Sequence, residues 1–283
     1  MSKPIKIVIT GSPGSGKTSY VALSLCCIYQ MSAQKNSPYS LWTEDTQKET
    51  VYIMDYPQKM KKGEWPSKTQ IQFDGFFNVD HDNPICIWPR CSTDFQLIDL
   101  PGELCSRETL TEQLSHDTGD LKALLERVRE AKYFMLMVDV TRLEDAEADE
   151  QKDTLRGISD ILNDIVSPKI RIAIVFTKCD RLNPDLYPEE KREDLLRRKF
   201  QEYHAAASKV FSKATIRYFC VSCLPKGEHR DTDVKRGVIA TKDWSWEDMK
   251  TQLQPWIWIF KQESIFGKCK WLESAVKKSA EKP

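Results

Sequence analysis

The sequence predicts an α/β fold, a doubly wound and mostly parallel sheet with helices on both faces and one antiparallel hairpin strand. Short apolar runs rich in β-branched residues alternate along the chain with longer segments of helical periodicity. This alternation is typical of a parallel sheet with helical crossovers. A cluster of turn-forming residues at 80–84 separates two of the runs, which indicates that those two pair as a hairpin.

The first strand is expected at 5–10, where a β-branched run precedes a glycine-rich turn and a helix at 16–31. The later strands are expected at 70–77, 84–88, 94–100, 132–139, 170–176 and 216–221. The later helices are expected at 119–131, 151–166, 186–212, 246–261 and, in shorter form, 270–279. The runs 70–77 and 84–88 form the expected hairpin. Residues 47–62 allow two interpretations, a helix broken at Pro57 or a short strand at 50–54.

The chain has 283 residues, 40% of them hydrophobic, which is enough to bury a full core. We expect a single domain over 1–283, because the motifs that carry its chemistry run from residue 11 to residue 223. Its parts would be a core at 5–223, a polar, mobile loop at 224–245 and C-terminal helices at 246–283 packed on the core. Trp256, Ile259 and Phe260 are expected to face the sheet, and Trp258 indicates a helix that is apolar nearly all round.

Composition excludes several classes of partner. Lysine and arginine balance aspartate and glutamate, and the pI is near 6.9, which argues against binding nucleic acid or an anionic membrane through bulk charge. No apolar run reaches the length of a transmembrane segment, and neither end carries a lipidation signal, so we expect no membrane anchor. The nine cysteines lack paired metal-ligand spacing and are expected to be free thiols in a reducing, cytoplasmic environment.

The segment 11–18 reads G-S-P-G-S-G-K-T and matches the pattern G-x-x-x-x-G-K-[ST] between a predicted strand and a predicted helix. The backbone N–H groups of such a loop and the dipole of the helix both attract phosphate. We expect Lys17 to reach the outer phosphates and the Thr18 hydroxyl to bind Mg²⁺. The sequence therefore predicts a nucleoside phosphate site formed by Gly11, Ser12, Pro13, Gly14, Ser15, Gly16, Lys17, Thr18 and Ser19.

The base is indicated by Thr177-Lys178-Cys179-Asp180, which directly follows the expected strand at 170–176. This string resembles the [NT]-K-x-D guanine-specificity motif of the P-loop GTPases. The Asp180 carboxylate can accept hydrogen bonds from guanine N1–H and N2–H₂, and adenine offers neither donor. The Lys178 stem would lie along the purine face. The motif implies that Thr177, Lys178 and Asp180 bind the base of GTP or GDP.

Two further strand ends fit the same class. Asp99 to Gly102 reads D-L-P-G, where Asp99 can hold a Mg²⁺-bound water and the Gly102 backbone N–H can reach a γ-phosphate. Ser222-Cys223 follows the strand at 216–221 and is similar to the Ser-Ala loop that closes over guanine in GTPases. In this order the motifs resemble a P-loop GTPase of the small-GTPase-like (TRAFAC) class over residues 5–223. The resemblance implies the α/β sheet of that class, with GTP, GDP and Mg²⁺ as ligands.

The interval from Thr18 to Asp99 is about twice as long as a minimal small GTPase uses. It contains the string G-E-W-P-S-K-T at 63–69, which resembles one in bacterial GTPase-like domains, including the double-GTPase proteins. The resemblance implies that Thr69 is the switch threonine, whose hydroxyl completes the Mg²⁺ coordination with Thr18 and Asp99. Other candidates for the switch threonine are Thr43, Thr46 and Thr50.

Glu103 stands where Ras-like GTPases have the glutamine that orients the attacking water. A carboxylate beside the γ-phosphate is costly unless a cation compensates it. Either Glu103 turns away and hydrolysis is slow, or it acts with an added lysine or arginine, and Arg90 and Arg107 are close in sequence. Slow intrinsic turnover is the favoured interpretation. The expected catalytic residues are Lys17, Thr69, Gly102 and Glu103.

The sequence thus favours a GTP-dependent regulatory switch that hydrolyses GTP slowly and signals to a protein effector or activator through 60–77 and 99–118. An ATP-dependent, kinase-like enzyme is the first alternative, which the segment 11–18 alone would allow and T-K-C-D argues against. The second alternative is a nucleotide-locked scaffold without turnover. The intact Lys17, Thr18 and Asp99 argue against the scaffold, and Glu103 leaves it open.

Overall fold

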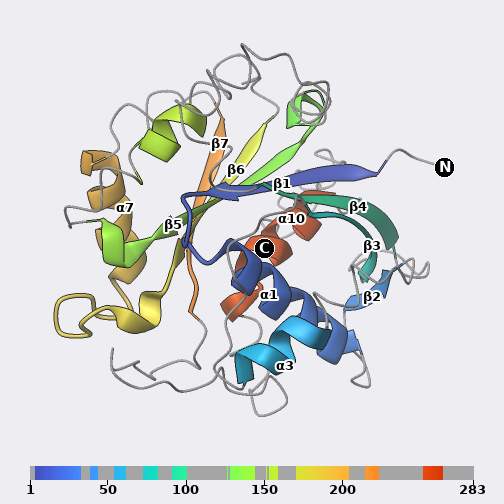
Figure 1. The fold of residues 1–283 in the computed structure, drawn as a ribbon, viewed down its shortest axis with the longest axis horizontal. Coiled ribbons are helices and arrows are strands. Elements are labelled where there is room, and N and C mark those ends of the chain that lie inside the picture. The colour runs from blue at the N-terminus through green and yellow to red at the C-terminus, as the bar shows by residue number, and fades with distance from the viewer. Residues whose placement is uncertain are drawn as a thin grey trace, which may run out of the picture.

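The computed structural model describes twelve parts of the chain, which together form one seven-stranded sheet with helices on both faces (Figure 1). These parts are residues 4–32, 39–43, 54–61, 73–81, 91–100, 126, 128–143, 151, 153–158, 170–203, 214–222 and 251–263. The doubly wound, mostly parallel α/β fold that the sequence predicts is confirmed.

The strands lie in the spatial order β2-β3-β4-β1-β5-β6-β7. Strand β1 pairs in parallel with β4 and β5, and β6 pairs in parallel with β5 and β7. Strand β3 is antiparallel to both β2 and β4, so it is the one described strand that runs against the others. The bounds are β1 Ile5–Gly11, β2 Tyr39–Thr43, β3 Phe73–His81, β4 Cys91–Asp99, β5 Tyr133–Asp139, β6 Arg171–Thr177 and β7 Thr215–Cys220.

The helices separate onto the two faces of the sheet. Helices α1 (Lys17–Ser32) and α10 (Gln254–Glu263) pack on one face, and α7 (Arg192–Tyr203) packs on the other (Figure 1). Along β1, Ile7 and Ile9 face α1 and α10, whereas Val8 faces the α7 side. Strands that are covered on both faces consist of nearly continuous apolar residues, and for this reason β1, β5 and β6 could be predicted from the sequence.

The structure differs from the sequence expectation at two elements. Strand β2 was not predicted. The helix expected from 186 begins only at Arg192, because Asn183 to Lys191 forms turns that contain Pro184 and Pro188, and a proline disfavours helix in the residue before it. The described neighbours of β3 are β2 and β4, and the segment 84–88, its expected hairpin partner, lies outside the described residues.

The short helix α3 (Tyr56–Lys61) lies within the segment 47–62 that allowed two interpretations, and residues 47–53 of that segment lie outside the described residues. Pro57 lies in its first turn, where a missing N–H costs no helical hydrogen bond, so α3 is not broken at this proline. The expected loop at 224–245 and the short helix near 270–279 lie outside the described residues. Among the helices that are described, none combines the length and apolar character needed to cross a membrane.

Helix α10 packs as its aromatic pattern predicts. Trp256, Ile259 and Phe260 of α10 are buried in the same core as α1. The Phe260 ring lies 5.4 Å from the ring of Phe95 on β4, measured between centroids. Trp258 is half-buried, and its ring contacts those of Tyr133 and Phe219 at centroid distances of 6.1 and 5.9 Å. The described end of the chain is therefore fixed to the sheet through α10.

Candidate functional site

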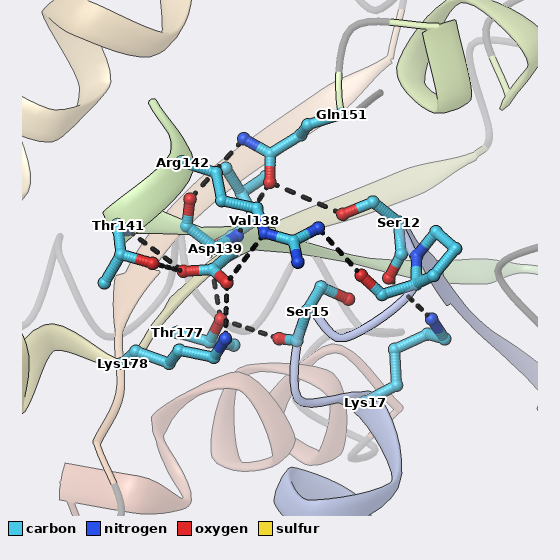
Figure 2. A network of polar contacts seen from close by, with 11 residues as sticks. Ser12, Ser15, Lys17, Val138, Asp139, Thr141, Arg142, Gln151, Thr177 and Lys178 are labelled. Carbon is cyan, nitrogen blue, oxygen red and sulfur yellow. Dashed lines mark hydrogen bonds and ion pairs between the residues drawn. The ribbon is translucent and has the colours of Figure 1, made fainter. Parts of the chain in front are cut away.

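The candidate site lies at the edge of the sheet where three parallel strands end side by side. Gly11 at the end of β1 is level with Met137 of β5, and Asp139 at the end of β5 is level with Thr177 of β6. In open α/β sheets, ligands bind in the crevice beyond the carboxyl ends of the strands. The segment 11–18 and the T-K-C-D string, far apart in sequence, therefore meet at one edge (Figure 2).

The loop after β1 has a backbone that its glycines make possible. Gly14 and Gly16 have φ angles of 73° and 84°, in the left-handed region that other residues rarely adopt. At Gly11 a β-carbon would lie 2.4 Å from the carbonyl oxygen of Met137, so β5 leaves no space for a side chain. The loop closes through a 3.1 Å bond from the Ser15 N–H to the Ser12 carbonyl.

Lys17 begins α1 and turns back onto the loop. Its side-chain nitrogen donates to the carbonyl oxygens of Gly11 and Ser12 at 2.8 and 3.0 Å, and the residue is 5% exposed. The adjacent Thr18 is also buried. An ammonium group held against the N-terminal end of a helix, where the helix dipole is positive, makes this end of α1 attractive to anions.

Thr177 joins the T-K-C-D string to the glycine-rich loop. Its hydroxyl lies 2.7 Å from the carbonyl oxygen of Ser15 and 3.2 Å from that of Val138. The hydroxyl has one proton, which the nearer Ser15 carbonyl is best placed to accept, and because Thr177 is buried this bond forms away from bulk water. The contact gives a physical reason for threonine at the position where asparagine is commoner, because a short hydroxyl side chain reaches the loop.

The rest of the string forms a turn beside the end of β7. Lys178 takes a left-handed conformation with φ 59°, and the 3₁₀ turn η4 (Cys179–Arg181) follows it. The Cys179 N–H donates to the carbonyl oxygen of Val221 at 3.3 Å, which places the string next to the segment leading into Ser222. Asp180 is 6% exposed. A carboxylate and a lysine thus lie within one turn at the same edge as the loop.

Asp139 organises the space between the string and the loop, and the sequence interpretation did not identify it. Its side chain is fully buried and forms an ion pair with Lys178 at 2.5 Å. It also accepts hydrogen bonds from the backbone N–H and the hydroxyl of Thr141 at 3.0 and 2.7 Å, and so caps the 3₁₀ turn η3 (Val140–Arg142). Burying a carboxylate is tolerable only with such partners.

Arg142 extends this network to the glycine-rich loop. Its guanidinium donates to the carbonyl oxygen of Pro13 at 3.1 Å, and its Nε lies 3.7 Å from the Asp139 carboxylate. In Figure 2 the guanidinium spans the space from Asp139 to the loop. Among the described residues Arg142 is therefore an arginine that contacts the loop, and the sequence candidates Arg90 and Arg107 lie outside the described residues.

Gln151 supports the network from a third element. Its Oε1 accepts from the Asp139 backbone N–H at 3.1 Å, and the Ser12 hydroxyl lies 3.5 Å from the same oxygen. Its side-chain nitrogen lies 3.4 Å from the Asp139 carbonyl oxygen. One buried amide thus ties the end of β5 to the loop. One sequence signal could have found Asp139. Like Asp99, it is a polar residue that directly follows the apolar run of a strand.

The remaining predicted site residues are only partly placed. Asp99 ends β4 and is level with Ile9 of β1, so D-L-P-G begins beside the strand that leads into the loop. Ser222 follows β7, and its backbone N–H donates to Gln252 Oε1 at 3.1 Å. Four residues lie outside the described part of the chain, and their roles stay predictions: Thr69, Gly102, Glu103 and Cys223.

Comparison with known proteins gives one family and several distant structures. The family model described as Double-GTPase 2 matches residues 5–232. No curated protein matches the chain. The chain is similar to sup35 complexed with GDP (11% identity, TM-score 0.36, 83% of this chain and 41% of that one). It is also similar to a GTP-binding protein from the hyperthermophilic archaeon Sulfolobus solfataricus in complex with GDP (18% identity, TM-score 0.29, 76% and 46%). The chain spans under half the length of these solved structures.

Proposed function

The chain belongs to the Double-GTPase 2 family, and on that premise we propose that it is a regulatory switch that binds GTP with Mg²⁺ and hydrolyses GTP slowly to GDP and phosphate. The observation that carries the proposal is the contact between the glycine-rich loop and the T-K-C-D string. Thr177 contacts the loop directly, and Lys178 reaches it through Asp139 and Arg142. A nucleotide needs both parts at once, one for its phosphates and one for its base.

The loop suits the phosphates of a nucleotide. The first backbone N–H groups of α1 and the positive end of its dipole favour an anion, and the Lys17 ammonium adds a full positive charge beside them. Lys17 would bind oxygens that GTP and GDP share, so it contributes to the affinity for both. Its buried position also keeps water away from the groups it would contact.

The T-K-C-D string suits guanine. Asp180 offers two acceptor oxygens at a buried position, and guanine presents two adjacent donors, N1–H and N2–H₂. A base without these donors would leave a desolvated carboxylate unpaired, which is a strong basis for rejection. The ion pair with Asp139 holds Lys178 in the turn, so Asp180 keeps a fixed direction relative to the loop.

Two residues at this edge fit a Mg²⁺ ion. Thr18 provides a hydroxyl in the first turn of α1, and Asp99 ends β4, the neighbour of β1. Mg²⁺ prefers oxygen ligands, and both residues supply them. When bound, the ion would neutralise charge on the outer phosphates. Thr69 is the proposed third ligand.

Turnover and signalling depend on the segment after Asp99. The Gly102 N–H would contact the γ-phosphate and so distinguish GTP from GDP. With Glu103 in place of glutamine, no neutral side chain orients the attacking water there, and hydrolysis is slow without a partner. A protein effector or activator would then recognise the GTP form through residues 60–77 and 99–118.

The test is competition for one site by two nucleotides. The nucleotide-free protein is titrated with a fluorescent GDP analogue in Mg²⁺ buffer, and the analogue is displaced with GTP or ATP. Displacement by GTP alone at micromolar concentration is expected, and equal displacement by ATP would contradict the guanine assignment. Lys17→Ala should abolish binding. Lys6→Ala is the matched control, because Lys6 lies at the opposite end of β1 and forms an ion pair with Glu130.

A further inference from the structure

Cationic side chains hold the carbonyl oxygens at the start of the glycine-rich loop. The Lys17 ammonium donates to the carbonyl oxygens of Gly11 and Ser12 at 2.8 and 3.0 Å. The Arg142 guanidinium donates to the next carbonyl oxygen along, that of Pro13, at 3.1 Å. Three consecutive carbonyl groups of the loop are therefore bound by side chains of the protein, and the directions of the loop's peptide groups depend on these donors.

The peptide group between Pro13 and Gly14 depends on Arg142. A trans peptide group is planar, and its carbonyl oxygen and its N–H point in opposite directions. Because Arg142 holds the Pro13 carbonyl, the Gly14 N–H points away from the guanidinium. Gly14 is exposed, and within the described part of the chain its N–H has no hydrogen-bond partner. This N–H is therefore a donor that a ligand can reach.

Arg142 is itself fixed between the loop and a buried carboxylate. Its Nε lies 3.7 Å from the carboxylate of Asp139, which is fully buried, and the Arg142 side chain is only 22% exposed. A β-carbon on Gly14 would lie 3.5 Å from Arg142 Nη2, so the guanidinium also packs against the loop at Gly14 (Figure 2). The donor that holds the Pro13 carbonyl is therefore rigidly placed.

The position of Lys17 indicates which ligand atoms the Gly14 N–H would meet. The Lys17 nitrogen is bonded to the two carbonyls directly before that of Pro13, so both donors belong to the same part of the loop. Phosphate oxygens accept hydrogen bonds from donors of either kind. Under the proposed function, Lys17 binds oxygens of the outer phosphates that GTP and GDP share. The Gly14 N–H belongs to the same set of contacts.

We propose that Arg142 is a positioning residue for the phosphates beyond the first, because it holds the Pro13 carbonyl and so directs the Gly14 N–H at one of their oxygens. A glycine leaves φ unrestricted by a side chain, so this peptide group needs an outside contact to keep one direction. The guanidinium binds the carbonyl side of the peptide group and the phosphate its N–H side, so Arg142 acts through Gly14. This inference rests on the proposed guanine-nucleotide function of the site.

Nucleotides that differ in their phosphates or in their base separate this role from base recognition. GMP lacks the second phosphate, whereas ITP keeps all three phosphates and lacks the N2 amino group that Asp180 would bind. Dissociation constants are measured for GMP, GDP, GTP and ITP by displacement of a fluorescent GDP analogue. Arg142→Met removes the donor and keeps an unbranched side chain. It should reduce the preference for GDP over GMP by about fivefold and leave the preference for GTP over ITP unchanged.

Two variants complete the experiment. Arg142→Lys keeps the positive charge, but one ammonium group does not replace a planar fork that contacts Asp139 and Pro13 at once, so the preference for GDP over GMP should stay reduced. Arg156→Met, the same substitution at an exposed arginine that pairs with Asp153, should match the wild type. If thermal melting shows that Arg142→Met is unfolded, Arg142→Gln, whose side chain is shorter and neutral, makes the same test.

The outcomes separate this inference from the function on which it rests. An unchanged preference for GDP over GMP in Arg142→Met, or equal losses of both preferences, would overturn the positioning role while leaving GTP binding intact. A full return to the wild-type preference in Arg142→Lys would also overturn it, because positive charge alone would then explain the effect. A wild-type protein that does not distinguish GTP from ATP would overturn the proposed function itself.

Discussion

The hydroxyl of Thr177 lies 2.7 Å from the main-chain carbonyl oxygen of Ser15, which joins the first residue of the T-K-C-D string to the glycine-rich loop. These two residues are 162 positions apart in the chain. Both are buried, so the bond is formed away from bulk water. The position of the string therefore depends on the position of the loop, and a nucleotide that touches one part finds the other already in place.

Replacing Thr177 tests this coupling. Thr177→Val keeps the side-chain shape and removes the donor, which leaves the buried Ser15 carbonyl without it at a cost of about 1–3 kcal/mol. Because the loop and the string then no longer share one fixed arrangement, we expect GTP and GDP affinities to fall about tenfold together. Thr177→Ser, which keeps the hydroxyl, should stay close to wild type. Equal affinities for Thr177→Val and wild type in displacement titrations would show that the contact does not organise the site.

Asp139 should matter for stability as well as for binding. Asp139→Asn removes the charge that Lys178 and Arg142 share, and breaking a buried pair costs about 3–5 kcal/mol. Asp153→Asn is the matched control, because Asp153 pairs with Arg156 on the exposed surface, where such a pair contributes about 0–1 kcal/mol. Urea unfolding of both variants measures the difference. A loss no larger in Asp139→Asn than in Asp153→Asn would refute the central place given to Asp139.

The strands that could be predicted are those whose burial requires apolar residues throughout. Strands β1, β5 and β6 are covered on both faces, so their residues are apolar almost without interruption and stand out as runs. Strand β2 is short and lies at the edge of the described sheet beside β3, and five residues carry too little periodicity to be recognised. The start of α7 was predicted too early, because the residues before Arg192 have helical periodicity but form the turns that contain Pro184 and Pro188.

The site was predictable where its chemistry depends on spacing within one segment. The loop from Gly11 to Thr18 is such a case, since its glycines and lysine act through positions fixed relative to one another. Arg142 was missed because it acts through Pro13, 129 positions away, and no local pattern records that contact. Gln151 was missed for the same reason, since it is a single polar residue whose role comes from the elements packed around it, whereas Asp139 carried only the general signal of a polar residue after a strand's apolar run.

A change at Thr18 tests whether the nucleotide state is sensed through Mg²⁺. Thr18→Asn removes the hydroxyl ligand from the ion that would bridge to the γ-phosphate, and only GTP has that phosphate. GTP affinity should fall more than GDP affinity. Titration of both nucleotides with and without a chelator is the measurement. Equal losses for the two nucleotides would remove the argument for a switch.

Glu103 governs the expected rate of turnover. With a carboxylate where a water-orienting glutamine is usual, wild type should hydrolyse GTP on the order of 10⁻⁴ to 10⁻² s⁻¹, in the range of intrinsic GTPase rates. Glu103→Gln should hold or raise this rate, because it removes repulsion with the γ-phosphate. Single-turnover hydrolysis of both proteins gives the comparison. A large loss in Glu103→Gln would identify Glu103 as the catalytic base instead.

The most direct measurement of the central claim, guanine recognition by Asp180, is the nucleotide preference of Asp180→Asn. The new amide can no longer accept from both N1–H and N2–H₂ of guanine, but its NH₂ can donate to the C2 carbonyl of xanthine. Isothermal titration of wild type and variant with GTP and XTP should show GTP preferred by wild type and XTP by Asp180→Asn. A wild type that binds XTP as tightly as GTP, or a variant that keeps the wild-type preference, would contradict the account.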